Sequence, residues 1–390
     1  MPNITVLGAG MVGSIIAADL ANDPAFTVTL ADLREENLAK AAARTPTLKT
    51  LRADLSDPAA VTKAIAGADL VCGALASRLG FQTLRTVLEA RKNYADISFF
   101  AEDALELDGL AKKMGVTAVV DCGVAPGMSN MTAGYGASYF DRCDKIAIYV
   151  GGLPRERRWP FQYKAGFAPS DVIEEYTRPS RIVEHGKLVV REALSEPELL
   201  DFPGVGTLEA FNTDGLRSLA YTLKVPHMVE KTMRYPGHIE LMRVLRHIGL
   251  FSQDAVEVPA ADGSRVKVRP LDVISTLMFP QWTYTPGEED LTIMRVTAEG
   301  EKSSRRERLT WDLSDAYDPK TRATSMSRTT AFPCAIMARK ILSGEFRRPG
   351  VIPPEFIGQT PGMLASILAE LESRGVRYTT RTEPLPGSRT

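Results

Sequence analysis

Short apolar runs and helix-like segments alternate along the first 120 residues of the chain. The runs expected to be strands are residues 4–7, 27–31, 49–53, 69–75, 93–96 and 117–120. Between them lie segments in which apolar residues recur at the spacing of a helix. This alternation predicts an α/β fold with a Rossmann-type, doubly wound parallel sheet.

The pattern changes after Asp121, where a loop rich in Gly and Pro precedes a helix of small residues. Later segments predict strands at residues 145–150, 181–190, 208–212, 229–234, 291–298, 307–313 and 323–327, with hairpin turns at His185-Gly186 and Gly300-Glu301. Helical spacing marks residues 238–247, 329–343 and 361–373. We expect a second α+β, largely antiparallel domain (126–328) for substrate binding and oligomerisation. The dinucleotide-binding domain would comprise residues 1–125 plus 329–390.

Composition limits the class of partner. The chain has 390 residues, with 47 Lys and Arg against 48 Asp and Glu, so we expect two domains and neither a nucleic-acid nor a membrane-surface partner. No run is apolar over the length of a membrane span and no cationic leader precedes the first strand, so a cytoplasmic protein is expected. The four Cys and four His lack the spacing of metal ligands, which favours buried free thiols and no metal centre.

A glycine motif, Gly8-x-Gly10-x-x-Gly13, directly follows the first expected strand. Glycines at these positions permit a tight turn, close approach of a pyrophosphate and close helix packing, and the helix N-terminus favours the negative charge. The sequence therefore predicts a nicotinamide dinucleotide at the carboxyl ends of the strands. The residues expected to contact it are Gly8, Ala9, Gly10, Met11, Val12, Gly13, Asp32, Arg34, Asp54, Ala74, Leu75, Ala76, Ser98, Gly123 and Val124.

Asp32 at the end of the second expected strand bears on the choice of cofactor. A carboxylate there can accept hydrogen bonds from the adenosine ribose and would repel a 2′-phosphate, which favours NAD over NADP. Arg34, two residues later, leaves the alternative open, because a guanidinium could bind that phosphate.

Several longer motifs resemble the saccharopine dehydrogenase family, in particular its bacterial lysine 6-dehydrogenase branch. They are residues 8–13, 121–128, 134–138, 149–154, 208–213 and 231–238. The resemblance implies NAD-dependent oxidative deamination of the side-chain amine of L-lysine to 2-aminoadipate 6-semialdehyde. Residues 214–217 depart from the small turn expected in the family.

Oxidation of a carbon that bears nitrogen requires a neutral amine, so a base must remove a proton from the substrate ammonium. Candidates are His238, Lys231, Tyr163 and Asp121. Each also has a structural reading: a helix-terminal histidine, a solvated lysine, a packed aromatic ring and a cap for the loop after residue 121.

A charged amino acid must also be held. Arg234 or Arg217 could bind the α-carboxylate in bidentate fashion, and Asp214 or Glu209 could pair the α-amine. The expected substrate-binding residues are Asn212, Thr213, Asp214 and Arg234.

Two other functions stay open at this stage. One is an NADP-dependent, glutamate-forming saccharopine reductase, which would need a second carboxylate clamp and a 2′-phosphate pocket. The other is a non-catalytic nicotinamide-binding protein. A homodimer or larger homo-oligomer is expected, because the second sheet could continue across a two-fold axis.

Overall fold

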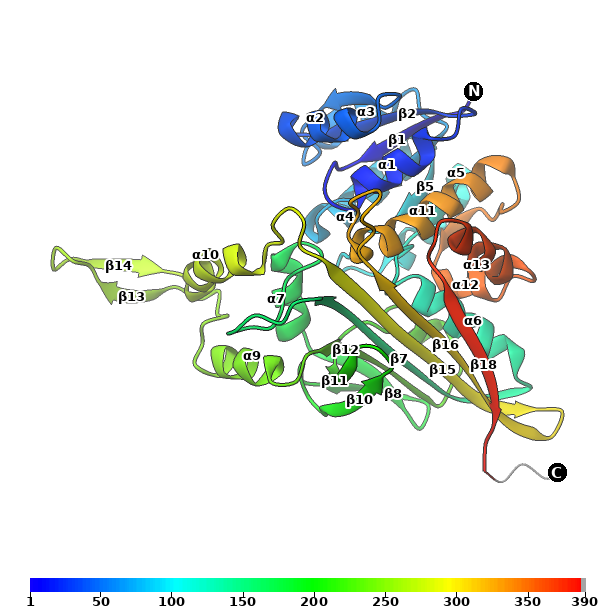
Figure 1. Cartoon of the computed structure of the whole chain (residues 1–390). Helices are drawn as coiled ribbons and strands as arrows, with labels where there is room; N and C mark the ends of the chain where they lie inside the picture. The colour runs from blue at the N-terminus through cyan, green and yellow to red at the C-terminus, as the bar shows by residue number, and fades with distance from the viewer. Residues whose placement is uncertain (387–390) are drawn as a thin grey trace.

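The computed structural model describes residues 1–386 and contains a parallel sheet and a second, larger sheet (Figure 1). The parallel sheet has the order β17-β6-β5-β4-β1-β2-β3, and all its neighbouring strands are parallel. Its strands are β1 (Asn3–Leu7), β2 (Thr27–Asp32), β3 (Lys49–Arg52), β4 (Leu70–Gly73), β5 (Asn93–Asp96), β6 (Thr117–Val119) and β17 (Gly350–Ile352). The six expected strands and the Rossmann-type fold are confirmed. The seventh strand comes from the C-terminal part of the chain.

Helices cover both faces of this sheet. Apolar side chains of α1 (Gly13–Ala21), α2 (Glu35–Arg44) and α11 (Ser325–Ser343) belong to one core. Those of α3 (Pro58–Ile65), α4 (Ser77–Glu89) and α5 (Asp108–Met114) belong to another, together with the short 3-10 helix η1 (Ala104–Leu107). Both faces of the inner strands are therefore removed from water, which explains their apolar runs, whereas the edge strand β3 is exposed.

The second sheet has nine strands and is mixed. Its long central strands are β7 (Arg142–Pro154), β15 (Asp290–Lys302) and β16 (Arg305–Ala316). The others are β8 (Ser180–Glu184), β9 (Lys187–Arg191), β10 (Glu198–Phe202), β11 (Gly206–Asn212), β12 (His227–Arg234) and β18 (Tyr378–Pro384). Pairing is antiparallel except between β12 and β7, so the second domain is largely antiparallel as expected.

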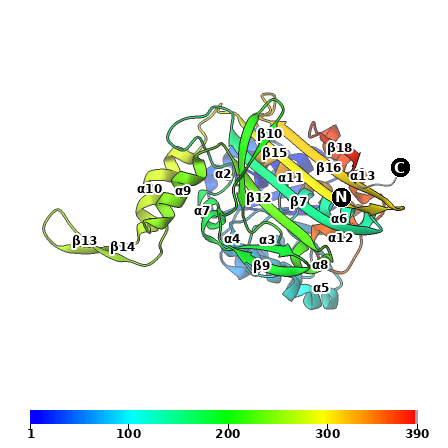
Figure 2. The ribbon, with the colours of Figure 1, turned by 90° about the horizontal axis from the view of Figure 1, so that it is seen from below.

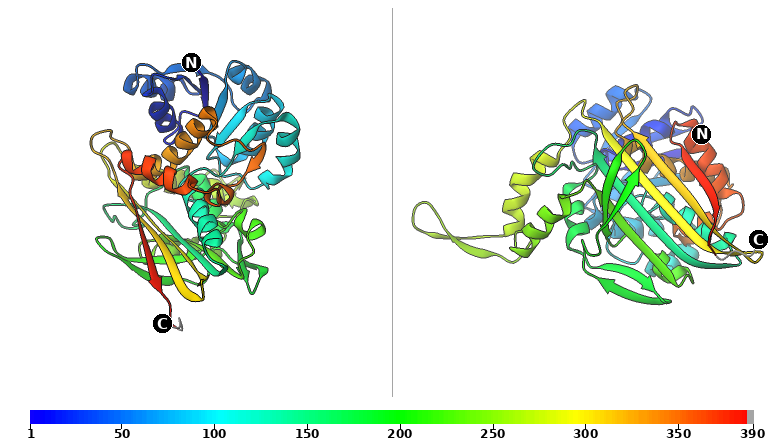
Figure 3. Two further views of the ribbon diagram at one scale, coloured as in Figure 1. Left: turned by 90° about the vertical axis from the view of Figure 1, so that its right-hand side faces the viewer. Right: turned by 60° about the horizontal axis from the view of Figure 1, so that its bottom comes forward.

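Helix α6 (Met128–Tyr139) packs on β7 and β15 and on α12 (Pro354–Gly358). Seen from the side, α6 and the C-terminal helices form a layer between the two sheets (Figure 3). The loop that follows β6 leads through α6 to β7 of the second sheet. Two short helices of the second domain are α7 (Pro169–Thr177) and α8 (Leu219–Thr222).

Two expectations for the second half were wrong. Residues 323–327 do not form a strand, because α11 begins at Ser325 and the Thr324 hydroxyl caps it by accepting a hydrogen bond from the Ser327 N–H. The β15–β16 turn lies at Ser303-Ser304, both with positive φ, because the two strands run past Gly300. The hairpin at His185-Gly186 is confirmed.

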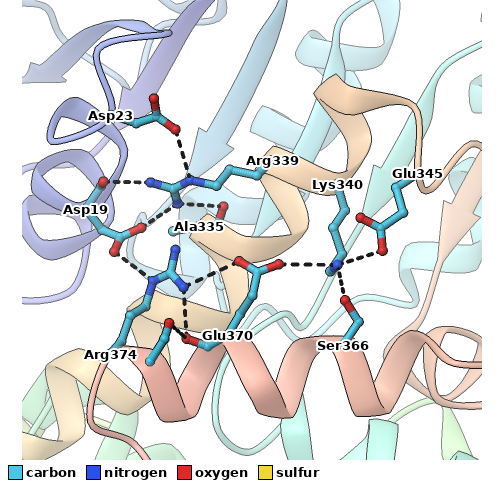
Figure 4. Close-up of polar contacts among 10 residues, drawn as sticks. Asp19, Asp23, Ala335, Arg339, Lys340, Glu345, Ser366, Glu370 and Arg374 are labelled. Carbon is cyan, nitrogen blue, oxygen red and sulfur yellow. Dashed lines mark hydrogen bonds and ion pairs between the residues drawn. The ribbon is translucent and has the colours of Figure 1, made fainter.

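Ion pairs attach the C-terminal helices to the first domain (Figure 4). Arg339 of α11 and Arg374, which follows α13 (Met363–Ser373), both bind Asp19 of α1, with Arg374 Nε 2.9 Å from the carboxylate. Strand β18, by contrast, pairs with β16 of the second sheet. The assignment of residues 329–390 to one domain stays a prediction, and in the structure this stretch contributes to both sheets.

An arm projects from the second domain (Figures 1 and 2). It carries α10 (Pro270–Trp282) and the hairpin of β13 (Val256–Pro259) and β14 (Arg265–Val268), beside α9 (His238–His247). Helix α9 has the bounds that the sequence predicted.

The expected homo-oligomer stays a prediction. All four cysteines are free and buried, as expected. No helix within residues 1–386 is long and apolar enough to cross a membrane.

Candidate active site

A cleft of about 650 Å³ lies at the carboxyl ends of the parallel strands and extends to the second sheet. One side is formed by the glycine loop and the loops after β4 and β6, and the other by α7, residues of β7 and β12, and the loop after β11. Ligands of open parallel sheets bind at this end of the strands. The cleft therefore joins the expected cofactor site to a polar region of the second domain.

The glycine loop leaves its backbone accessible. A Cβ atom on Gly13 would lie 1.9 Å from the Gly8 carbonyl oxygen, whereas one on Gly10 would meet nothing within 4 Å. Within residues 1–386 the N–H groups of Met11, Val12 and Gly13 donate to no protein acceptor. Free N–H groups at a helix N-terminus, beside open space, fit the pyrophosphate of a dinucleotide.

Asp32 is bound by the backbone around it. Its Oδ2 accepts a hydrogen bond from the Ala9 N–H and its Oδ1 from the Arg34 N–H, each at 2.7 Å. The Arg34 side chain is 72% exposed, lines the cleft and lies 3.9 Å from the Asp32 carboxylate. Asp32 thus stabilises the glycine loop, and its expected contact with a ribose stays a prediction.

Of the other residues expected to contact the cofactor, some line the cleft and others do not. Ala74, Leu75, Ala76, Gly123 and Val124 line the cleft together with the glycine loop. Ser98 lies behind it, and its hydroxyl accepts a hydrogen bond from the Leu75 N–H.

Besides Ser98, two further expected cofactor residues do not line the cleft, Asp54 and Ala9. Asp54 is exposed and accepts hydrogen bonds from Ser56 in the turn after β3. The Ala9 N–H is bound by Asp32.

Three of the four expected substrate residues line the polar end: Thr213, Asp214 and Arg234. Asn212 does not, and its amide donates to Ser195 and Glu196. Arg181 binds both oxygens of Asp214 at 2.7 and 2.8 Å.

The Arg234 guanidinium is buried and already has several partners. It donates to the Tyr176 hydroxyl at 3.0 Å and to the Glu175 carboxylate at 3.1 Å. These bonds fix the direction in which its charge faces the cleft.

None of the four candidate bases lines the cleft. His238 stands behind Arg234: its Nε2 accepts from the Tyr176 hydroxyl at 2.9 Å and its Nδ1 donates to the Phe161 carbonyl at 2.8 Å. Burial, with the nearby charge of Arg234, lowers the pKa of His238 to about 3, so the ring is neutral. Because both ring nitrogens of His238 are hydrogen-bonded, the neutral ring holds the Tyr176 hydroxyl in place.

The other three candidates are also held in place. Tyr163 contacts Arg234, and burial raises the pKa of its phenol well above 10. Lys231 binds the Glu196 carbonyl and the Glu198 carboxylate, each at 2.8 Å. Asp121 is paired with Arg217, Nε to Oδ2 at 3.1 Å. A catalytic role for any of the four stays a prediction.

Four carboxyl groups of the cleft were not among the residues expected from the sequence. The missed residues are Asp171, Glu174, Glu175 and Glu230. Burial raises the pKa of Glu230 to about 8 and that of Glu175 to about 7. For the first three a signal was present, since residues 171, 174 and 175 are spaced to share one face of a helix.

Comparisons with known proteins agree with this architecture. The saccharopine dehydrogenase NADP binding domain matches residues 4–119, and the saccharopine dehydrogenase C-terminal domain matches residues 123–376. The structure of apo saccharopine dehydrogenase (L-Glu forming) from Saccharomyces cerevisiae is similar, with a TM-score of 0.81 at 19% identity over 98% of this chain and 100% of that chain.

Two curated proteins that are similar to this chain have different names. Saccharopine dehydrogenase (NADP(+), L-glutamate-forming) of Schizosaccharomyces pombe is 23% identical over 91% of this chain and 94% of that protein. Carboxynorspermidine synthase of Vibrio cholerae is 25% identical over 64% of this chain and 60% of that protein. Neither name supports the narrower lysine 6-dehydrogenase branch, which stays a prediction. Two family models that together match most of the chain, with the cleft at their junction, show that the chain belongs to the saccharopine dehydrogenase family.

Proposed function

We propose that this chain is an NADP-dependent oxidoreductase that makes or breaks the bond between a nitrogen and a carbon at the oxidation level of an aldehyde. In the reductive direction an aldehyde and an amine lose water and form an imine. The imine carbon then accepts a hydride from the reduced nicotinamide and the nitrogen accepts a proton, which gives a secondary amine. The reverse reaction is oxidation followed by hydrolysis.

The observation that carries this proposal is the shared cleft. The glycine loop, with its free N–H groups, and the polar group of Arg234, Glu175 and Glu230 line one cavity. A dinucleotide on the loop would extend along the strand ends, so its nicotinamide would reach the loop at Gly123 and Val124. The family and the names of its members supply the reaction class.

Arg34 supports NADP over the NAD that the position of Asp32 first favoured. Both Asp32 oxygens are bound by backbone N–H groups, while the Arg34 guanidinium is exposed at the cleft and can meet a 2′-phosphate. The family model and the fission-yeast relative also carry NADP in their names. Of the two narrower functions, the relatives favour the NADP-dependent saccharopine reductase over the NAD-dependent lysine 6-dehydrogenase.

A cofactor assay tests this proposal. Purified protein would be mixed with 2-aminoadipate 6-semialdehyde, an amine and either NADPH or NADH, and the absorbance of the reduced cofactor followed. L-glutamate and L-lysine would serve as separate amines, and L-lysine with NADP or NAD would test direct oxidation. We expect oxidation of NADPH with a kcat/KM at least about tenfold above that of NADH. No cofactor turnover in either direction would contradict an enzymatic function.

A further inference from the structure

One buried carboxyl group on the wall of the cleft has no cation beside it. Glu230 of β12 lines the cleft, is only 4% exposed and forms no ion pair within residues 1–386. Asp171 at the same end of the cleft is less buried. Three other carboxyl groups there are already paired: Glu174 with Arg178, Glu175 with Arg234 and Asp214 with Arg181. Since a buried carboxylate without a cation is costly, burial favours the protonated form of Glu230.

The hydrogen bonds of Glu230 decide which oxygen carries that proton. Its Oε2 accepts from the Gly215 N–H at 3.0 Å and from the Thr213 hydroxyl at 2.6 Å. The Thr213 oxygen in turn accepts from the Thr232 N–H at 3.1 Å and lies 2.8 Å from the Thr232 hydroxyl, which can donate to it. The Thr213 hydrogen is then left for Oε2. Because Oε2 has two donors and no donor within residues 1–386 bonds Oε1, the proton of the acid form belongs on Oε1.

The turn that binds Glu230 also reaches the loop after β6. A Cβ atom on residue 215 would overlap the carboxyl group of Glu230, so Gly215 allows the turn to pass this close. Two residues later, Arg217 donates to Asp121, Nε to Oδ2 at 3.1 Å. Asp121 lies two residues before Gly123, where the nicotinamide is expected. This connection puts Glu230 toward the nicotinamide end of the cleft, away from the glycine loop.

We propose that Glu230 is the acid and base of the step in which water leaves or enters the substrate. This inference rests on the proposed function. In the reductive direction Oε1 gives its proton to the hydroxyl group of the carbinolamine, the adduct of the aldehyde and the amine. The C–O bond breaks, water leaves, and the nitrogen lone pair closes the C=N bond. The iminium carbon can then accept the hydride, and Glu230 regains a proton from water in the cleft.

The oxidative direction uses the other form of the same group. Once the hydride has left the substrate, an iminium ion remains. Water attacks its carbon, the Glu230 carboxylate takes the proton of that water, and the carbinolamine then separates into aldehyde and amine. Burial raises the pKa of Glu230 to about 8, and the negative charges of Glu175 on α7 and Asp214 in the turn add to this rise. A carboxyl group with such a pKa can give and take a proton near neutral pH.

A burst experiment in the oxidative direction separates this step from hydride transfer. The protein would be mixed in a stopped-flow instrument with NADP and with saccharopine or L-lysine, whichever the wild type oxidises faster, and the absorbance of the reduced cofactor followed. In Glu230→Gln we expect about one NADPH per active site to form at nearly the wild-type rate, followed by a steady state at least about a hundredfold slower than that of the wild type. Hydride transfer would be intact, and hydrolysis of the iminium ion would limit turnover.

Glu257→Gln is the matched control, because Glu257 lies on the projecting arm and is exposed; its kinetics should equal those of the wild type. An unchanged steady-state rate in Glu230→Gln would overturn the inference. A first turnover slowed as much as the steady state would also overturn it, because Glu230 would then act on hydride transfer or on the fold.

If Glu230→Gln does not fold, Thr213→Val replaces it. The Thr213 hydroxyl lowers the pKa of Glu230, so its loss should raise that pKa and move the pH profile of the steady-state rate to higher pH. A profile that stays in place would overturn the inference.

The wild type separates this failure from failure of the proposed function. Turnover by the wild type with the same kinetics in Glu230→Gln would keep the reaction class and overturn only the role of Glu230. Absence of turnover by the wild type, here and in the reductive assay, would overturn both.

Discussion

The Asp32 carboxylate accepts a hydrogen bond from the backbone N–H of Ala9 at 2.7 Å, which joins the end of β2 to the glycine loop. Its other oxygen closes the turn into α2 through the Arg34 N–H. An acidic residue at this position is usually taken as evidence for NAD. Here the carboxylate shapes the loop that would hold the pyrophosphate of either cofactor.

Asp32→Ala should therefore weaken the binding of both NADP and NAD. Loss of two hydrogen bonds to a buried carboxylate should also lower the free energy of unfolding by about 2–4 kcal/mol. Asp32→Asn should be milder, since its amide oxygen can still accept one of the bonds. Calorimetric titration with each cofactor and urea unfolding would measure these effects. A variant that lost only NAD would show that the carboxylate selects the cofactor.

Arg34→Ala should separate the two cofactors. Removal of the exposed guanidinium should raise the Kd for NADPH about tenfold or more and leave that for NADH nearly unchanged, because only NADPH carries the 2′-phosphate. Fluorescence titration of both reduced cofactors would measure this. Arg44→Ala, an exposed change at the end of α2, is the control. Equal weakening of both cofactors would place Arg34 on the shared adenosine.

Glu230 should make the stability of the protein depend on pH. Burial raises its pKa from 4.5 to about 8, so the folded state binds more protons than the unfolded state between these values. Its contribution to the free energy of unfolding should then fall as pH rises from about 4.5 to about 8, by up to about 1.4 kcal/mol per pH unit. Glu230→Gln should gain stability relative to the wild type over this range and level off above it. Urea unfolding at several pH values would measure the difference, and a constant offset would contradict the assignment.

His238→Ala tests whether His238 acts as a base or as a positioning residue. Because the ring is neutral down to a pKa of about 3, its removal should not change the pH profile of turnover at pH 6–9. It should lower the free energy of unfolding by about 2–4 kcal/mol, since it leaves the Phe161 carbonyl and the Tyr176 hydroxyl without their partner. It should also raise the KM of the substrate, because Tyr176 orients Arg234. Loss of one limb of the pH profile would instead identify His238 as the base.

Asp19→Ala should loosen the C-terminal helices. Arg339 and Arg374 both depend on this carboxylate, so we expect a loss of about 2–4 kcal/mol in the free energy of unfolding and faster amide exchange in α11 and α13. Asp23→Ala is the control, since Asp23 is more exposed and its contact with Arg339 is 3.8 Å. Equal effects of the two variants would contradict the central role of Asp19 (Figure 4).

The sequence by itself determined the parts of the fold that depend on local patterns. Apolar runs defined β1 to β6, Gly8, Gly10 and Gly13 defined the loop after β1, and helical spacing defined α9 to the residue. These features follow from backbone conformation and from burial of neighbouring side chains, which are encoded over a few residues. The longer motifs also resemble the saccharopine dehydrogenase family, so the sequence indicated the family as well as the fold.

Tertiary structure decided which side chains share the cleft. The expected bases His238 and Lys231 carry suitable chemical groups. Hydrogen-bond partners distant in sequence, however, hold both side chains away from the lining of the cleft. Glu230 lies at the cleft because Thr213 and Gly215 of another segment bind it. Likewise β17 joins β6 across more than two hundred residues. Contacts of this kind depend on how separate elements pack, so no local pattern in the chain records them.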